Sequence, residues 1–167
     1  MQLLLKTFFD IILLRKGPEH VPASWLILLL AVGLMVLSVF SATVLIPSTG
    51  EQNYFVIYAS SVVGLLVYSG VLFVTGYGRR LLPVLSAIIA CGSILTLLFV
   101  AEYVLLQPFL GPRIARIGAT LIIFWSVPVE GHIIARAIQQ HWFAGIAIAM
   151  IVFILQISFQ QMLTANP

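Results

Sequence analysis

Charged residues are scarce in this sequence. Only 8% of the 167 residues are Asp, Glu, Lys or Arg, whereas soluble domains carry about 25%. Hydrophobic residues make up 62% of the chain, and the mean hydropathy is +1.16. A soluble fold cannot hide that much apolar surface, so the composition excludes a soluble domain. It predicts an all-α integral membrane protein with one compact domain.

Cysteine is almost absent as well. Cys91 is the single cysteine, which excludes an internal disulfide and a multi-cysteine metal site. Because it lies inside an apolar run, we expect it to be a small packed residue. The eight Lys and Arg form no basic run, so nucleic acid is not an expected partner. A cleaved signal peptide is not expected, since the first long apolar run starts only at Ser24.

Long apolar runs fill most of the chain. A spanning helix needs about 20 mostly apolar residues. Four runs meet this length, at 24–46, 54–76, 82–106 and 142–163. A fifth run, 113–135, is interrupted by polar groups and spans only if Glu130 lies at membrane depth. We therefore predict a compact bundle of five transmembrane helices within residues 24–167.

The first 23 residues differ from the rest. Gln2, Lys6 and Asp10 recur every four positions in an otherwise apolar stretch, and Gly17 and the prolines after it end the pattern. This is typical of a short amphipathic helix lying in the membrane interface. The alternative is that residues 1–16 pack on the protein itself.

The basic residues predict the orientation. With five spans, the opposite side from the N-terminus holds only Arg113 and Arg116, and the N-terminal side holds Lys6, Arg15, Lys16, Arg79, Arg80 and Arg136. The positive-inside rule then places the N-terminus in the cytoplasm and the C-terminus outside. The compact chain favours a bacterial inner membrane.

Ionisable residues avoid the centres of the predicted spans and form two layers. In the outer layer, Glu102 and Arg116 are about equally far from the turn between spans three and four, which predicts a structural ion pair with Arg113 nearby. The inner layer is a cytoplasmic-edge polar cluster of Arg79, Arg80, Glu130, His132, Arg136 and His141. We expect Glu130 to mark the point where span four leaves the membrane, next to Pro128.

Few residues suggest chemistry. Glu130 and His132 are two positions apart and face different sides of a helix, so no metal site is predicted. No catalytic motif or cofactor signature is present, and a catalytic residue is not assigned. Small residues such as Gly145 and Ala149 favour close helix packing. One face of span two carries Tyr54, Tyr58, Ser61 and Tyr68, which indicates either core packing or a lipid or quinone groove.

The segment "GYGRRLLPVL" (76–85) is similar to the Gly-Tyr…Leu-Leu-Pro pattern that enters the third span of the Yip family. It departs from that pattern by inserting Gly78, Arg79 and Arg80. The span layout also resembles this family of five-span membrane proteins. The resemblance implies a cytoplasmic N-terminal segment before five closely spaced spans. Eukaryotic members interact with Rab GTPases, but this chain lacks their long N-terminal region and looks more like the bacterial relatives.

Two functions from different classes follow from these patterns. The first is a non-enzymatic accessory, scaffold or assembly partner of a larger membrane complex, in contact with membrane lipids and other integral membrane proteins. It rests on the absence of midplane chemistry and on the small-residue faces. The alternative is a transporter or lipid- or quinone-binding protein that uses the tyrosine face of span two and Glu102. A lipid-modifying enzyme is a third and weaker hypothesis.

Overall fold

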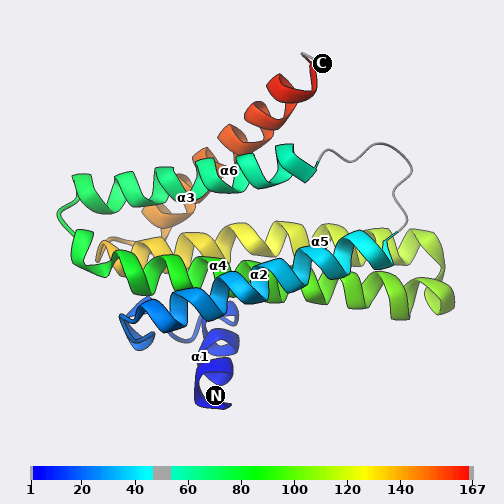
Figure 1. Ribbon diagram of the computed structural model, residues 1–167, viewed down its shortest axis with the longest axis horizontal. Helices are drawn as coiled ribbons and strands as arrows, with labels where there is room; N and C mark the ends of the chain where they lie inside the picture. Colours follow the sequence, from blue (N-terminus) through cyan, green and yellow to red (C-terminus); the bar gives the residue numbers. More distant parts are fainter. Residues whose placement is uncertain (1, 47–53, 166–167) are drawn as a thin grey trace.

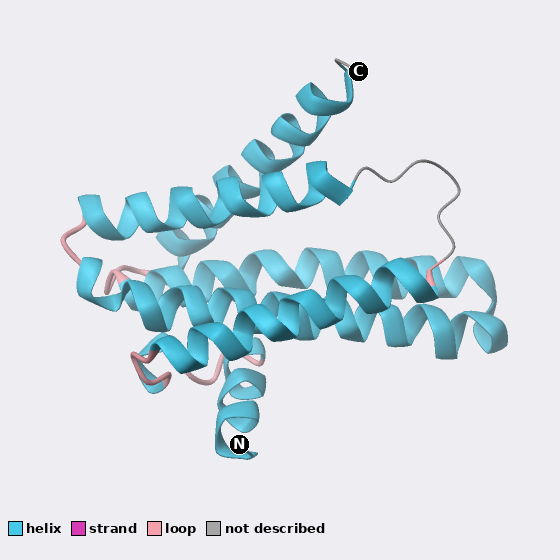
Figure 2. Ribbon diagram, in the orientation of Figure 1, coloured by secondary structure: helices cyan, strands magenta, loops and turns pink. Residues whose placement is uncertain are grey.

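The computed structural model describes residues 2–46 and 54–165, and the regular structure in these ranges is entirely helical (Figures 1 and 2). The long helices are α1 (Gln2–Ile12), α2 (Trp25–Leu45), α3 (Tyr54–Val74), α4 (Leu81–Ala101), α5 (Gln107–Ala137) and α6 (Trp142–Ala165). Two short 3₁₀ helices, η1 (Pro18–His20) and η2 (Gly78–Arg80), and the π-helix η3 (Glu102–Leu106) connect them. The predicted all-α class is confirmed.

Four helical stretches are long and apolar enough to cross a membrane: Trp25–Leu45, Gly78–Phe109, Gly111–Ala137 and Trp142–Thr164. The third of these contains the interrupted run 113–135, so length and composition allow that run to span. The described apolar part of α3, Ala59–Val74, is shorter. The fifth crossing therefore stays a prediction.

Local sequence sets the helix boundaries. Ser24 caps α2, because its side-chain oxygen accepts a hydrogen bond from the Leu26 N–H at 3.3 Å. Gly111, near the start of α5, has a φ of 79°, a positive value that favours glycine, and the chain reverses there. After this turn α5 continues through Pro128 to Ala137.

Helices α2 to α5 alternate in direction along the chain, whereas α1 and α6 are inclined to them (Figure 1). Within the most apolar window of each stretch, 56% of residues are buried for α4, compared with 17% for α2 and for α6. Helices α2 and α5 pack against α4, and α6 packs against α5 and α3. Helix α3 makes its main contact with α6, while its contacts with α4 are sparse. The molecule therefore has a dense α2–α4–α5 part and a looser α3 side.

Two glycines bring α5 and α6 into backbone contact. A Cβ atom added to Gly131 would lie 2.8 Å from the Ile146 Cα, and one added to Gly145 would lie 2.6 Å from the Ala135 Cβ. Only glycine fits at both positions. Ala149, one turn further along α6, is also buried. The close packing predicted for the Gly145 and Ala149 face is confirmed.

Helix α1 is part of the core. Its N-terminal end extends away from the bundle (Figure 1), while Phe8, Ile11 and Ile12 are buried in the same cluster as residues of α4 and α5. The Trp125 indole N–H donates to the Ile12 carbonyl at 3.0 Å, and the Cys91 thiol lies 3.8 Å from the Phe8 carbonyl. The alternative considered from the sequence, packing on the protein itself, is what the structure shows. The helix also ends at Ile12, earlier than the predicted 16.

Candidate functional site

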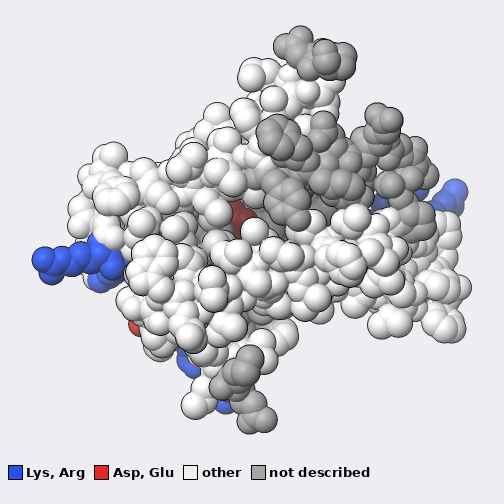
Figure 3. Space-filling view, in the orientation of Figure 1, with Lys and Arg blue, Asp and Glu red and all other residues white. Residues whose placement is uncertain are grey.

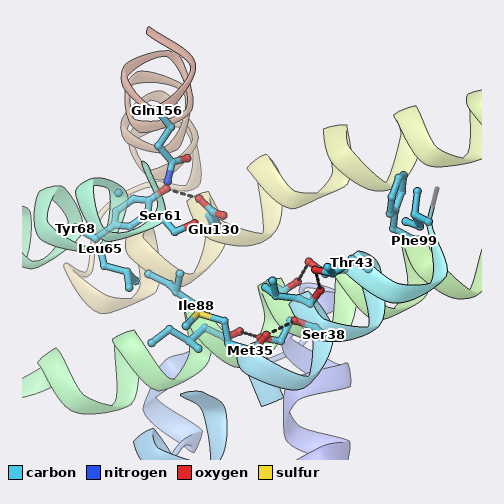
Figure 4. A pocket seen from close by; sticks show the side chains of 18 residues that line it. Met35, Ser38, Thr43, Ser61, Leu65, Tyr68, Ile88, Phe99, Glu130 and Gln156 are labelled. Carbon is cyan, nitrogen blue, oxygen red and sulfur yellow. Dashed lines mark hydrogen bonds between the residues drawn. The ribbon is translucent and has the colours of Figure 1, made fainter. Parts of the chain in front are cut away.

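A cavity of about 410 Å³ lies between α2, α3 and α4, with one residue each from α5 and α6 in its wall. Figure 3 shows acidic atoms recessed in a hollow of this face, and Figure 4 shows the lining side chains. Most of the lining is apolar or small; it includes Met35, Val39, Leu65, Ile88, Gly92 and Phe99. This volume falls within the range of about 300–1,000 Å³ that is typical of small-molecule sites.

The polar part of the wall joins three helices. The Tyr68 hydroxyl of α3 donates to the Glu130 carboxylate Oε2 of α5 at 2.5 Å. Gln156 of α6 points toward the same place (Figure 4), and its amide donates to the Ser60 carbonyl at 3.3 Å. Any side chain at Gly64 would collide with the Gln156 amide. Glycine at position 64 therefore lets α6 bring Gln156 to the cavity.

Four of the other lining residues carry a hydroxyl group whose proton is engaged in a hydrogen bond within its own helix. Ser38, Thr43, Ser93 and Thr96 each donate to a carbonyl of their own helix, at distances of 2.7 to 2.9 Å. Their oxygen lone pairs can still accept a hydrogen bond. The polar surface that these four residues offer is therefore mainly an acceptor surface.

Glu130 lies inside α5, and its position at the membrane exit of span four stays a prediction. It lies seven residues before Ala137, the last residue of α5, which is about 10 Å along the helix. Its described hydrogen bond runs to Tyr68, and no basic side chain lies within ion-pair distance of it among the described residues. Because α5 continues as a helix through Pro128, Glu130 stays inside the bundle.

The other members of the predicted cytoplasmic-edge cluster do not form one site. Arg80 donates to the Ala137 carbonyl at 2.8 Å, and His132 lies 3.0 Å from the Lys16 carbonyl. Arg136 lies 3.9 Å from Glu19, at the outer limit of an ion pair. His141 stacks on Phe143, and Arg79 is exposed. These contacts fix helix ends and the chain before α2.

The ion pair predicted between Glu102 and Arg116 does not form. Arg113 and Arg116 are exposed, and neither pairs with an acid within the described part of the chain. Glu102 begins the π-helix η3 and turns toward Gly118 of α5, where an added Cβ would lie 3.0 Å from its Oε1. Its Oε2 is buried and has no hydrogen-bond partner among the described residues. The extra residue in the π-helical turn changes the direction of Glu102, which sequence spacing cannot show.

The side chains of two of the four residues of the predicted tyrosine face of span two are described. Tyr68 and Ser61 line the cavity. The side chains of Tyr54 and Tyr58 lie outside the described residues. No three His, Cys, Asp or Glu side chains are placed to share a metal ion in the ranges that the structure describes.

An ion pair between Lys16 and Asp10 lies outside the predicted spans. The Lys16 ammonium lies 2.8 Å from the Asp10 carboxylate at the end of α1. This hydrogen bond, with weaker attraction from Lys6 and Arg15, lowers the pKa of Asp10 below its ordinary value. Deprotonated Asp10 therefore helps to fix the turn that leads from α1 to α2.

Tyr68 and Glu130 both stand out in the sequence, but as parts of different features. Their hydrogen bond and the position of Gln156 beside them are seen only in the structure. Small and hydroxyl residues near the middle of three spans, such as Ser38, Gly92 and Thr96, were a signal for a cavity between those spans. Small and hydroxyl residues also occur where helices pack tightly, so this pattern indicates either a cavity or a close helix contact.

Comparison with models of known protein families, with curated proteins and with solved structures finds no match for this chain. The resemblance to the Yip family therefore stays a prediction.

Proposed function

We propose that this protein is a five-span membrane protein that binds a small amphiphile in the cavity between α2, α3 and α4. The observation that carries this proposal is the Tyr68–Glu130 hydrogen bond in the wall of an otherwise apolar cavity. Ligand sites combine an apolar lining with a few placed polar groups in this way. The apolar part of the ligand would lie against side chains such as Met35 and Ile88, and its polar end would meet Glu130.

This proposal keeps the sequence-based alternative of a lipid- or quinone-binding protein but changes the acid. Glu102 does not line the cavity, whereas Glu130 does. The first hypothesis, an accessory or assembly partner, relied on the absence of chemistry between the spans. A carboxylate facing a cavity weakens that reason, and the accessory function stays a prediction.

Filling the cavity tests the function. A Cβ atom on Gly92 would meet nothing within 4 Å, so Gly92→Leu occupies cavity space without a clash at its base. Gly70→Leu is the matched control, because Gly70 has equally open surroundings and does not line the cavity. Protein purified in mild detergent would be extracted and its bound small molecules identified by mass spectrometry.

We expect a molecule bound to the wild type and to Gly70→Leu, and its loss from Gly92→Leu. Equal retention by all three proteins would contradict the cavity as the binding site. A stoichiometric protein partner without any bound small molecule would favour the accessory function instead.

The topology part of the proposal has its own test. Five crossings place the N-terminus in the cytoplasm and the C-terminus outside, because six of the eight basic residues then face the cytoplasm. In a bacterial inner membrane, a C-terminal alkaline phosphatase fusion should be active and a C-terminal fluorescent-protein fusion dark. The opposite pair of results would exclude this orientation.

A further inference from the structure

The charges around the cavity restrict what can bind there. Among the described residues, no Lys, Arg or His lines it, and Glu130 supplies the one carboxyl group of the lining. A ligand with a negative charge would enter this space with no positive group to compensate for its lost hydration. Moving an unpaired charge out of water is costly, so anionic headgroups are disfavoured.

The hydrogen bonds around the cavity also restrict the class of ligand. Glu130 Oε2 already accepts from Tyr68, and the second carboxylate oxygen has no described partner that donates to it. The hydroxyl protons of Ser38, Ser93 and Thr96 are bound to carbonyls of their own helices. Apart from the Gln156 amide, whose nitrogen donates to the Ser60 carbonyl, a ligand therefore meets mostly acceptors, and acceptors are satisfied by donors.

We propose that the polar end of the ligand is a hydrogen-bond donor without negative charge, an amine or a hydroxyl, and that it binds to the free oxygen of Glu130. This inference rests on the proposed function and specifies the chemical class of its ligand. Tyr68 acts as a positioning residue, because its hydroxyl holds the Glu130 carboxylate at the cavity wall.

A cysteine-protection experiment on the full chain tests this specificity. Leu65→Cys places a thiol on the lining between Tyr68 and Ile88 (Figure 4), in a Cys91→Ser background. Met35→Cys supplies a second reporter on the α2 wall, in case the first variant does not fold. The measured quantity is the rate at which a small methanethiosulfonate modifies the thiol in detergent-solubilised protein. The probes share one tail and differ only in the head: dodecylamine, dodecanol, dodecyl methyl ether and dodecanoate.

We expect dodecylamine and dodecanol to slow modification at concentrations about tenfold lower than the ether, because only these two heads donate a hydrogen bond to Glu130. Dodecanoate should protect least. Glu130→Gln should remove most of the advantage of the amine. Glu102→Gln, which changes a carboxylate outside the cavity, should leave the order of the probes unchanged.

The outcomes separate the two proposals. Protection by none of the four probes in either reporter would overturn the proposed function itself. Protection by the ether or by dodecanoate at the same concentration as the amine and the alcohol would leave a binding cavity but overturn the donor specificity. An unchanged order of probes in Glu130→Gln would overturn the role of Glu130.

Discussion

The α5–α6 contact and the cavity between α2, α3 and α4 both contain small residues, but the helices touch at the first and stay apart at the second. At the first, Gly131 and Gly145 meet residues of the facing helix at backbone distance. At the second, Gly92 faces open space and a cavity remains. The difference shows that a small residue closes an interface only when the facing helix is also small there and close enough to use the space.

The largest expected effect on stability is at the α5–α6 contact. Gly145→Ala would place a methyl group against the backbone of Gly131 and the side chain of Ala135. Backbone atoms cannot move away cheaply, so we expect a loss of about 3 kcal/mol in unfolding free energy. Thermal unfolding in mild detergent would measure it. The control Gly70→Ala meets nothing within 4 Å and should be neutral or slightly stabilising. Equal behaviour of the two variants would show that α5 and α6 are not in close contact.

The next effect tests the cavity wall. Tyr68→Phe removes the donor to Glu130 and leaves a half-buried carboxylate oxygen unsatisfied, at a cost of about 2 kcal/mol. Replacing both residues, in Tyr68→Phe with Glu130→Leu, should recover much of this loss. The same unfolding assay applies. Tyr103→Phe is the control, because the Tyr103 hydroxyl makes no hydrogen bond to the residues that the structure describes. A loss that is simply additive in the double variant would argue against the Tyr68–Glu130 bond.

A smaller effect concerns a third contact of α5, where Gly118 faces a carboxylate. Because Glu102 Oε2 is buried without a partner among the described residues, Glu102→Leu should stabilise the protein by about 1 kcal/mol or leave it unchanged. Arg116→Leu should act independently, since the two residues form no ion pair. A double-mutant cycle on thermal stability measures their coupling. Strong coupling would restore the ion pair that the sequence predicted and contradict the observed direction of Glu102.

The smallest effect is at the docking of α1. Lys16 lowers the pKa of Asp10 in the folded protein, so the contribution of Asp10 to stability is complete above the ordinary pKa of Asp. This contribution is lost as the pH falls from the ordinary pKa through the lowered pKa of the folded state. The indole of Trp125 contacts the end of α1 and reports on it. In a Trp25→Phe, Trp142→Phe background, acid should shift Trp125 fluorescence. Asp10→Asn should remove this transition, and an identical acid transition in Asp10→Asn would assign it to another group.

The candidate site was only partly predictable from residue patterns. Tyr68, Ser61 and Glu130 stood out because hydroxyl and acidic groups are rare in apolar runs. Their proximity was not predicted, because Glu130 was assigned to the cytoplasmic-edge polar cluster and Tyr68 to the tyrosine face of span two. The Glu102–Arg116 pair failed for a related reason, because equal distance from a turn fixes depth but not the direction of a side chain around its helix.

The sequence by itself determined the helical class, the approximate limits of the long helices and the small-residue face at Gly145. Composition and the length of apolar runs fix these features, because every backbone polar group must be satisfied within its own helix when lipid is the solvent. Tertiary structure alone decided that α1 joins the core, that α3 stands apart from α2 and that Tyr68, Glu130 and Gln156 meet at one cavity. These outcomes depend on how helices rotate and tilt against one another. Apolar side chains cover every face of such helices, so periodicity carries almost no signal for that choice.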